Sequence, residues 1–86
     1  MYILQSITTD RYYIGHTDSL SRRLEEHNTG LSKYTRNYRP WRLVYSEEYA
    51  TRSKAIMREL EIKRKKSRKY IEGLIKAGER PDTTES

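Results

Sequence analysis

The sequence contains no cysteine and no phenylalanine, and it has no long run of apolar residues. Without cysteine, the chain can form no disulfide, no thiolate zinc site and no cysteine nucleophile, and this absence is typical of a reducing, intracellular setting. No segment is long and apolar enough to span a membrane, and the first residues lack the layout of a secretory signal. With 86 residues, the chain is expected to be one small cytoplasmic domain with no membrane partner.

Charge is distributed unevenly along the chain. Residues 1–50 carry seven Lys and Arg against six Asp and Glu, whereas residues 51–78 carry ten against three. The densest basic run consists of Lys63, Arg64, Lys65, Lys66, Arg68 and Lys69. A field of this sign attracts nucleic acid, although such a run can also be only a solvated helix face. Because the aromatic residues are eight Tyr and one Trp, they suit a wet, phosphate-rich surface.

Local patterns predict the element order β-β-α-β-α-α and an α+β fold. The predicted elements are strands near 1–6, 11–16 and 42–48 and helices near 19–28, 52–65 and 68–77. The first two strands form a hairpin, and the sheet is three-stranded and mainly antiparallel, with the helices covering one face. Segment 31–40 is predicted to be a loop. Residues 1–78 are expected to form the domain, and residues 79–86 a disordered C-terminal tail.

A carboxylate falls on the apolar face of the helix predicted near 52–65. The apolar stripe of this helix consists of Ala55, Ile56, Leu60 and Ile62. Glu59 lies within the stripe, whereas Glu61 points to the opposite side. A carboxylate in such a place needs a cation, which can be Lys or Arg in an ion pair or a divalent metal ion.

The helix predicted near 19–28 repeats this pattern. Arg23 and His27 flank its buried side, which Leu20 and Leu24 mark. The residues predicted to face away are Arg22, Glu25 and Glu26. Taken alone, Arg23 and His27 can be ordinary partly buried side chains.

Five polar side chains can nevertheless converge on the small sheet. Tyr2 and Tyr13 lie one on each strand of the hairpin, and Arg23, His27 and Glu59 lie on the inward edges of two helices. A lone carboxylate suits Mg²⁺, which fills its other positions with water and phosphate oxygens, and Arg suits the phosphate itself. The sequence offers no Ser-His-Asp arrangement, no zinc ligand set and no glycine-rich phosphate loop. The convergent set therefore indicates phosphodiester hydrolysis.

At these positions the chain resembles the GIY-YIG endonuclease family. Tyr2-Ile3-Leu4 stands at the first motif without its leading Gly, and Tyr13-Ile14-Gly15 is an intact second motif. The spacing of eleven positions between the tyrosines and ten from Tyr13 to Arg23 is typical of the family. His27 matches a family His or Tyr, and Glu59 matches its metal-binding glutamate.

The resemblance covers roughly residues 1–75 and is closest to a small bacterial single-domain branch, through segments 32–36 and 39–41. This branch is similar to the N-terminal nuclease domain of the excision-repair incision subunit, which implies a setting in DNA repair. Many family members place an Asn after the metal glutamate, and none follows Glu59.

The resemblance implies an endonuclease that hydrolyses DNA with one Mg²⁺ or Mn²⁺ ion bound by Glu59. Tyr2 would accept a proton from the attacking water, with its pKa tuned by Tyr13, Arg23 and His16. Arg23 would also stabilise charge on the phosphate.

Three further assignments complete the implied site. His27 would orient the phosphate or relay a proton, and Gly15 would let the backbone and the substrate approach closely. Gly15, His16 and the basic run would contact DNA. The expected partner is DNA alone, with no small-molecule cofactor, and the protein is expected to be a monomer or a weak dimer.

Alternatives to this hypothesis remain. The first is a catalytically weak or inactive nucleic-acid-binding module of the same fold, favoured by the missing Asn and by the lack of a targeting domain. The second is a small basic structural protein of the ribosome or nucleoid. At the site itself, the structural alternative is that Glu59 and Arg23 form an ion pair.

Overall fold

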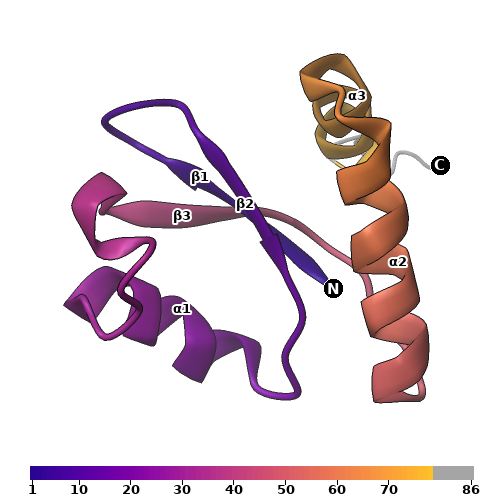
Figure 1. The fold of residues 1–86 in the computed structure, drawn as a ribbon, viewed down its shortest axis with the longest axis horizontal. Coiled ribbons are helices and arrows are strands. Elements are labelled where there is room, and N and C mark those ends of the chain that lie inside the picture. Colours follow the sequence, from indigo (N-terminus) through magenta and orange to yellow (C-terminus); the bar gives the residue numbers. More distant parts are fainter. Residues whose placement is uncertain (79–86) are drawn as a thin grey trace, which may run out of the picture.

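The computed structural model describes residues 1–78, whose elements follow the order β-β-α-β-α-α (Figure 1). The elements are β1 (Tyr2–Ser6), β2 (Tyr12–Gly15), α1 (Leu20–Thr29), a short 3₁₀ helix η1 (Arg36–Tyr38), β3 (Trp41–Ser46), α2 (Arg52–Lys65) and α3 (Arg68–Gly78). The predicted α+β class and its six elements are confirmed, and η1 lies within the segment predicted as a loop. The predicted tail at 79–86 lies outside the described residues.

The three strands form an antiparallel sheet in the order β2-β1-β3, so the first strand of the chain is the central one. β1 and β2 pair as the predicted hairpin, with Tyr2 opposite Gly15 and Leu4 opposite Tyr13. Because side chains alternate along a strand, Tyr2 and Leu4 belong to one face of β1 and Ile3 to the other. This register brings Tyr2 and Tyr13 into one aromatic cluster, in which their ring centroids lie 6.2 Å apart.

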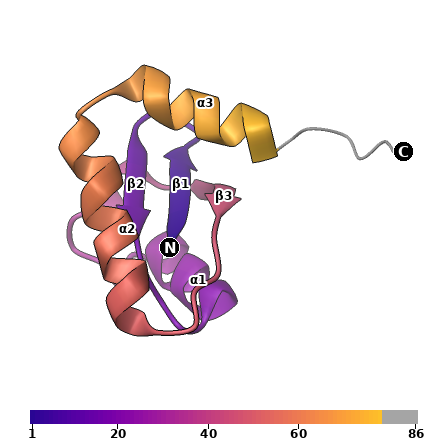
Figure 2. The ribbon, with the colours of Figure 1, turned by 90° about the vertical axis from the view of Figure 1, so that its right-hand side faces the viewer.

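The helices cover both faces of the sheet, so the prediction that they share one face is wrong. On one face, Tyr2, Leu4 and Trp41 pack against Leu20 and Leu24 of α1. The other face consists of Met1, Ile3 and Ile14 of the hairpin, packed with Ile62 of α2 and with Ile71 and Leu74 of α3. Figures 1 and 2 show α1 on one side of the sheet and α2 and α3 on the other. A carboxylate on α2 can therefore reach side chains of α1 only around the edge of the sheet.

The predicted loop is tied to α1 by hydrogen bonds. The Asn28 side chain donates to the Trp41 carbonyl at 2.9 Å and accepts from its backbone amide at 2.6 Å. The Trp41 indole is buried and donates to the carbonyl of Thr35 at 2.8 Å. These bonds fold the loop over the hairpin and bury the Thr35 side chain beside α1.

The rotation of α2 about its axis differs in part from the predicted stripe. Ala55 and Ile62 are buried as expected, but Leu60 is 43% exposed. The inward positions are instead Ala55, Arg58, Glu59 and Ile62, which follow the spacing of one helical face.

An ion pair fixes this rotation. Arg58 donates to both carboxylate oxygens of Glu47, at 2.9 and 3.2 Å. Burial alone would raise the pKa of Glu47, but hydrogen bonds from Arg58, Tyr45 and Tyr49 outweigh it and lower the pKa to about 2. Glu47 therefore stays charged at neutral pH and holds Arg58 inward, which places the neighbouring Glu59 at the edge of the sheet.

Candidate active site

Gly15 makes room for the phenol of Tyr2. A Cβ atom at Gly15 would lie 2.7 Å from the Tyr2 hydroxyl oxygen and 3.1 Å from the Tyr13 ring. Both contacts are closer than van der Waals distance, so a side chain here would displace the tyrosines. The space that was expected to admit an approaching substrate is filled by Tyr2 itself.

The Tyr2 hydroxyl is the centre of the cluster. Its oxygen lies 3.1 Å from Nε2 of His27 and accepts from Nε of Arg23 at 3.4 Å. Only 2% of Tyr2 is exposed. Burial raises the pKa of Tyr2 to about 12, and the Arg23 hydrogen bond offsets this rise only in part. The free protein thus contains a neutral phenol, and the expected tuning of its pKa toward neutrality is absent.

His27 is fully buried between α1 and the loop. Its Nδ1 lies 2.7 Å from the hydroxyl of Thr35, and its ring centroid lies 4.8 Å from that of Tyr13. Burial, followed by the nearby Arg23 charge, lowers the pKa of His27 to about 4. The imidazole is therefore neutral at neutral pH. Because it is fully buried, His27 cannot orient a phosphate by direct contact in this structure.

Arg23 forms its ion pair with Glu26, and the alternative of an Arg23–Glu59 pair is not found. Nη1 of Arg23 lies 2.9 Å from a carboxylate oxygen of Glu26 on the next turn of α1. Glu26 was expected to face away, but its side chain is only 30% exposed because it turns toward this guanidinium. About a third of the Arg23 side chain is exposed, so the guanidinium links the buried phenol to the surface.

Glu59 lies at the edge of the sheet and has two cationic partners. One carboxylate oxygen accepts from Nδ1 of His16 at 2.6 Å and the other from Nζ of Lys63 at 2.6 Å. Burial alone would raise the pKa of Glu59, but Lys63 and His16 lower it overall. The expected cation is therefore a lysine one turn along the same helix. Since His16 directly follows β2, its bond also ties α2 to that strand.

The predicted set thus divides into two groups. Tyr2, Tyr13, Arg23 and His27 form one contiguous cluster between the hairpin and α1. Glu59 lies on the other side of the strand edge, yet its charge contributes to the raised pKa of Tyr2, so the two groups interact electrostatically.

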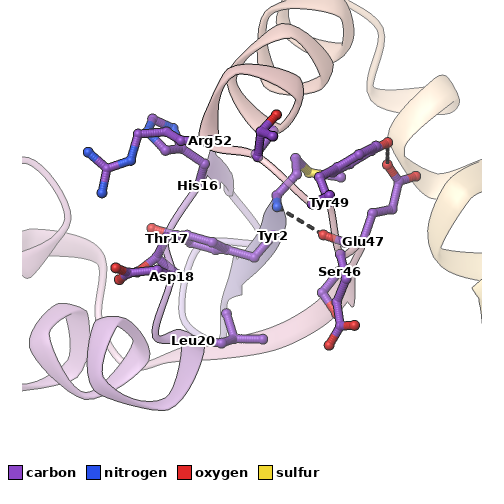
Figure 3. Close-up of a pocket in the computed structure, with 14 residues that line it drawn as sticks. Tyr2, His16, Thr17, Asp18, Leu20, Ser46, Glu47, Tyr49 and Arg52 are labelled. Carbon is purple, nitrogen blue, oxygen red and sulfur yellow. Dashed lines mark hydrogen bonds between the residues drawn. The ribbon is translucent and has the colours of Figure 1, made fainter.

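A cavity of about 470 Å³ opens beside both groups. Figure 3 shows Tyr2 at its centre, with His16, Thr17 and Asp18 on one side and Ser46 and Glu47 on the other.

The six residues of the basic run are not equivalent. Lys63 is bound to Glu59, and Arg68 pairs with Glu72 at 3.0 Å while its guanidinium covers the Tyr12 ring. Lys65 lies over the ring of Tyr70. The remaining three are exposed and have no ion pair within residues 1–78: Arg64, Lys66 and Lys69.

Two residues of the segment predicted as a loop lie against the cluster. Thr35 contacts His27, and Tyr34 is 64% exposed with its ring centroid 6.1 Å from that of Tyr13. Exposed basic side chains, Lys33 and Arg36, flank Tyr34. The alternation of aromatic and basic residues in this loop was the signal that could have identified it as part of the site.

Comparison with known proteins identifies the family. Residues 1–71 match the domain described as the GIY-YIG catalytic domain. The chain belongs to the GIY-YIG family. This GIY-YIG domain is 42% identical over 67 residues to a UPF0213 protein of Streptococcus pneumoniae serotype 4, a match that covers 77% of this chain and 67% of the relative.

A second relative supports the same family. A UPF0213 protein of Staphylococcus aureus strain Mu3 is 48% identical over 52 residues, which cover 59% of this chain and 63% of that protein. No solved structure gives a significant match to the GIY-YIG domain. In the part of the chain that the structure describes, no helix is both long and apolar enough to cross a bilayer.

Proposed function

We propose that this GIY-YIG domain is a metal-dependent endonuclease that hydrolyses phosphodiester bonds in DNA. One observation supports this proposal above all others. The buried hydroxyl of Tyr2 is held by Arg23 and lies against His27, while the carboxylate of Glu59 is within electrostatic reach. A protein that only binds nucleic acid does not need a phenol, a guanidinium and a carboxylate at one point, whereas hydrolysis of a phosphodiester does.

Glu59 fits a single-carboxylate site for Mg²⁺ or Mn²⁺. Residues 1–78 contain no group of three or more His, Cys, Asp or Glu that could hold a metal by themselves. Mg²⁺ accepts one or two carboxylates and completes its shell with water and substrate phosphate oxygens. When bound, such an ion would stabilise negative charge on the phosphate and on the leaving oxygen.

The two cations on Glu59 differ in their freedom to leave it. The Lys63 side chain is 49% exposed and can turn outward to a phosphate, whereas His16 is 32% exposed and continues directly from β2. We therefore expect Lys63 to release its carboxylate oxygen when a metal ion binds, and His16 to keep the other oxygen oriented.

Arg23 and Tyr2 would act on the phosphate and the attacking water. The partly exposed guanidinium can donate to phosphate oxygens, where its planar fork matches the geometry of the charge. The Tyr2 oxygen would accept the proton of the water. Hydrogen bonds from neighbouring donors stabilise the ionised phenol that this role requires.

DNA would lie across two surfaces beside the site. Arg64, Lys66 and Lys69 offer cations near the junction of α2 and α3. On the other side, the exposed ring of Tyr34 and its basic neighbours extend the cluster toward solvent. Together they would hold the backbone on either side of the scissile phosphate with little base readout.

The proposal is tested by DNA cleavage with the purified protein. We expect cleavage in Mg²⁺ or Mn²⁺, none in excess chelator, and restoration when the metal is added back. Single-stranded, nicked, branched and duplex DNA should be compared. Binding without cleavage on all four would favour the inactive binding module instead.

A second experiment tests the basic surface. Removing the charges of Lys66 and Lys69 together, each by substitution with Gln, should weaken binding equally on unrelated sequences. The slope of log K against log salt should fall by about 0.9 for each phosphate of duplex DNA that the protein no longer neutralises. The matched control is Lys54→Gln, which removes one exposed charge from the opposite end of α2. An unchanged slope in the double variant would show that these lysines only solvate the helix ends.

A further inference from the structure

Both ring nitrogens of His27 are engaged, although a neutral imidazole carries only one proton. Nδ1 lies 2.7 Å from the Thr35 hydroxyl, and Nε2 lies 3.1 Å from the Tyr2 hydroxyl. One nitrogen must therefore donate and the other must accept. Which nitrogen holds the proton decides whether His27 gives a hydrogen bond to Tyr2 or receives one from it.

The Thr35 hydroxyl resolves this choice. It is fully buried, and His27 Nδ1 is its sole hydrogen-bond partner within residues 1–78. A buried hydroxyl proton without an acceptor is destabilising. If Nδ1 carried the imidazole proton, the Thr35 proton would have no acceptor among these residues. If Nε2 carries it, the Thr35 proton is satisfied by Nδ1.

We propose that Thr35 is a positioning residue whose hydroxyl donates to Nδ1 of His27 and thereby fixes the imidazole proton on Nε2. His27 is then a permanent donor to the Tyr2 oxygen. The structure of the loop explains how Thr35 reaches this position, because the bond from the Trp41 indole to its carbonyl holds it over α1.

This assignment changes the role of His27 in the reaction. The Tyr2 oxygen receives two donors, from Arg23 and His27, and the phenol proton points away from both. On loss of that proton to solvent, the phenolate remains stabilised by a cation and an N–H group and can accept the proton of the attacking water.

The opposite tautomer would make His27 a proton relay and leave an imidazolium buried beside Arg23. The pKa of His27, lowered to about 4 by burial and by that charge, opposes such a relay. The effect on cleavage rests on the proposed function, whereas the tautomer itself does not.

The experiment is ¹H–¹⁵N NMR of the histidine rings in the full chain. We expect the protonated-nitrogen signal of His27 on Nε2 and the unprotonated signal on Nδ1. His16, the other histidine, is an internal reference because its Nδ1 is bound to Glu59. A His27 ring protonated on Nδ1 in the parent protein would overturn the proposal.

Two variants extend the test. Thr35→Val keeps the shape of the side chain but removes the hydroxyl, so the fixed Nε2–H tautomer should give way to a mixture while the His16 signals stay unchanged. Thr35→Ser restores the hydroxyl and should restore the parent spectrum. Thr29→Val, at an exposed threonine of α1, is the matched control and should leave the His27 ring unchanged.

Cleavage supplies the second measurement. By analogy with residues that orient catalytic ligands, Thr35→Val should lower kcat by about 10- to 100-fold with little change in KM, and Thr35→Ser should recover most of it. An unchanged His27 tautomer in a folded Thr35→Val protein would refute the positioning role. If that variant fails to fold, the parent and Thr35→Ser spectra still decide. A parent protein that cleaves no DNA but shows the Nε2–H tautomer would contradict the proposed function alone.

Discussion

Substitution of Glu59 with Gln is expected to lower metal-dependent cleavage by about two to three orders of magnitude, the usual effect of losing an electrostatic group that acts in the transition state. Gln has the same volume and still accepts hydrogen bonds, so it can keep the contacts with His16 and Lys63 and preserve the fold. As a neutral ligand, however, it binds Mg²⁺ far more weakly. Cleavage rates across a Mg²⁺ titration, together with thermal unfolding of both proteins, measure the two effects separately.

Glu61→Gln is the internal control for this substitution. It removes a carboxylate from the same helix, but the Glu61 side chain is 55% exposed and pairs with Arg58 at 3.1 Å, away from Tyr2. Exposed pairs of this kind contribute little to stability, so the control should be nearly silent in both measurements. If Glu59→Gln cleaves as well as the parent, Glu59 is a structural partner of Lys63 and His16 and not a metal ligand.

The contacts of Glu59 also explain why sequence reasoning found its position but not its partners. Helical periodicity places Glu59 on the inward face of α2, and this is confirmed by its limited exposure. The identity of the cation depends on side-chain reach. Lys63 is a neighbour on the same helix and was available from the sequence, whereas His16 meets Glu59 only because α2 packs beside β2.

The wrong prediction of a one-sided sheet has a physical reason in β1. Met1-Tyr2-Ile3-Leu4 is a continuous apolar run in which every residue is buried. Such a run indicates a strand that is covered on both faces, because a half-exposed strand alternates with polar residues. The predicted position of the strand is correct, but placing all the helices on one side treats this strand as half-exposed.

Leu60 and Thr35 show two other limits. Both Leu60 and Glu59 fall within one helical stripe, but the Arg58–Glu47 pair rotates α2 so that Leu60 lies outside the core. That pair joins residues eleven positions apart and has no periodic signature. Thr35 is buried because its loop folds back onto α1, and no local pattern marks a polar loop residue as buried.

The phenol of Tyr2 gives the second large effect. Tyr2→Phe keeps the ring that fills the space over Gly15 and removes only the hydroxyl, so the domain should fold. Loss of a general base typically costs about two to four orders of magnitude in rate, and we expect a loss in kcat of that size. The matched control is Tyr12→Phe, which removes a phenol from the same hairpin, but one that packs against the opposite face of the sheet.

The pH profile makes this prediction specific to proton transfer. Because the pKa of Tyr2 is raised to about 12, the phenol is neutral at neutral pH and its ionised fraction grows about tenfold for each pH unit below that value. If the ionised form is the proton acceptor, the cleavage rate of the parent should rise with pH in the same proportion, until bound metal and DNA shift the pKa or the protein unfolds. The rise should be present in Tyr12→Phe and absent from the residual activity of Tyr2→Phe. A tenfold rise per pH unit that persists in Tyr2→Phe would assign the proton to another acceptor, such as metal-bound water, and would leave Tyr2 a packing residue.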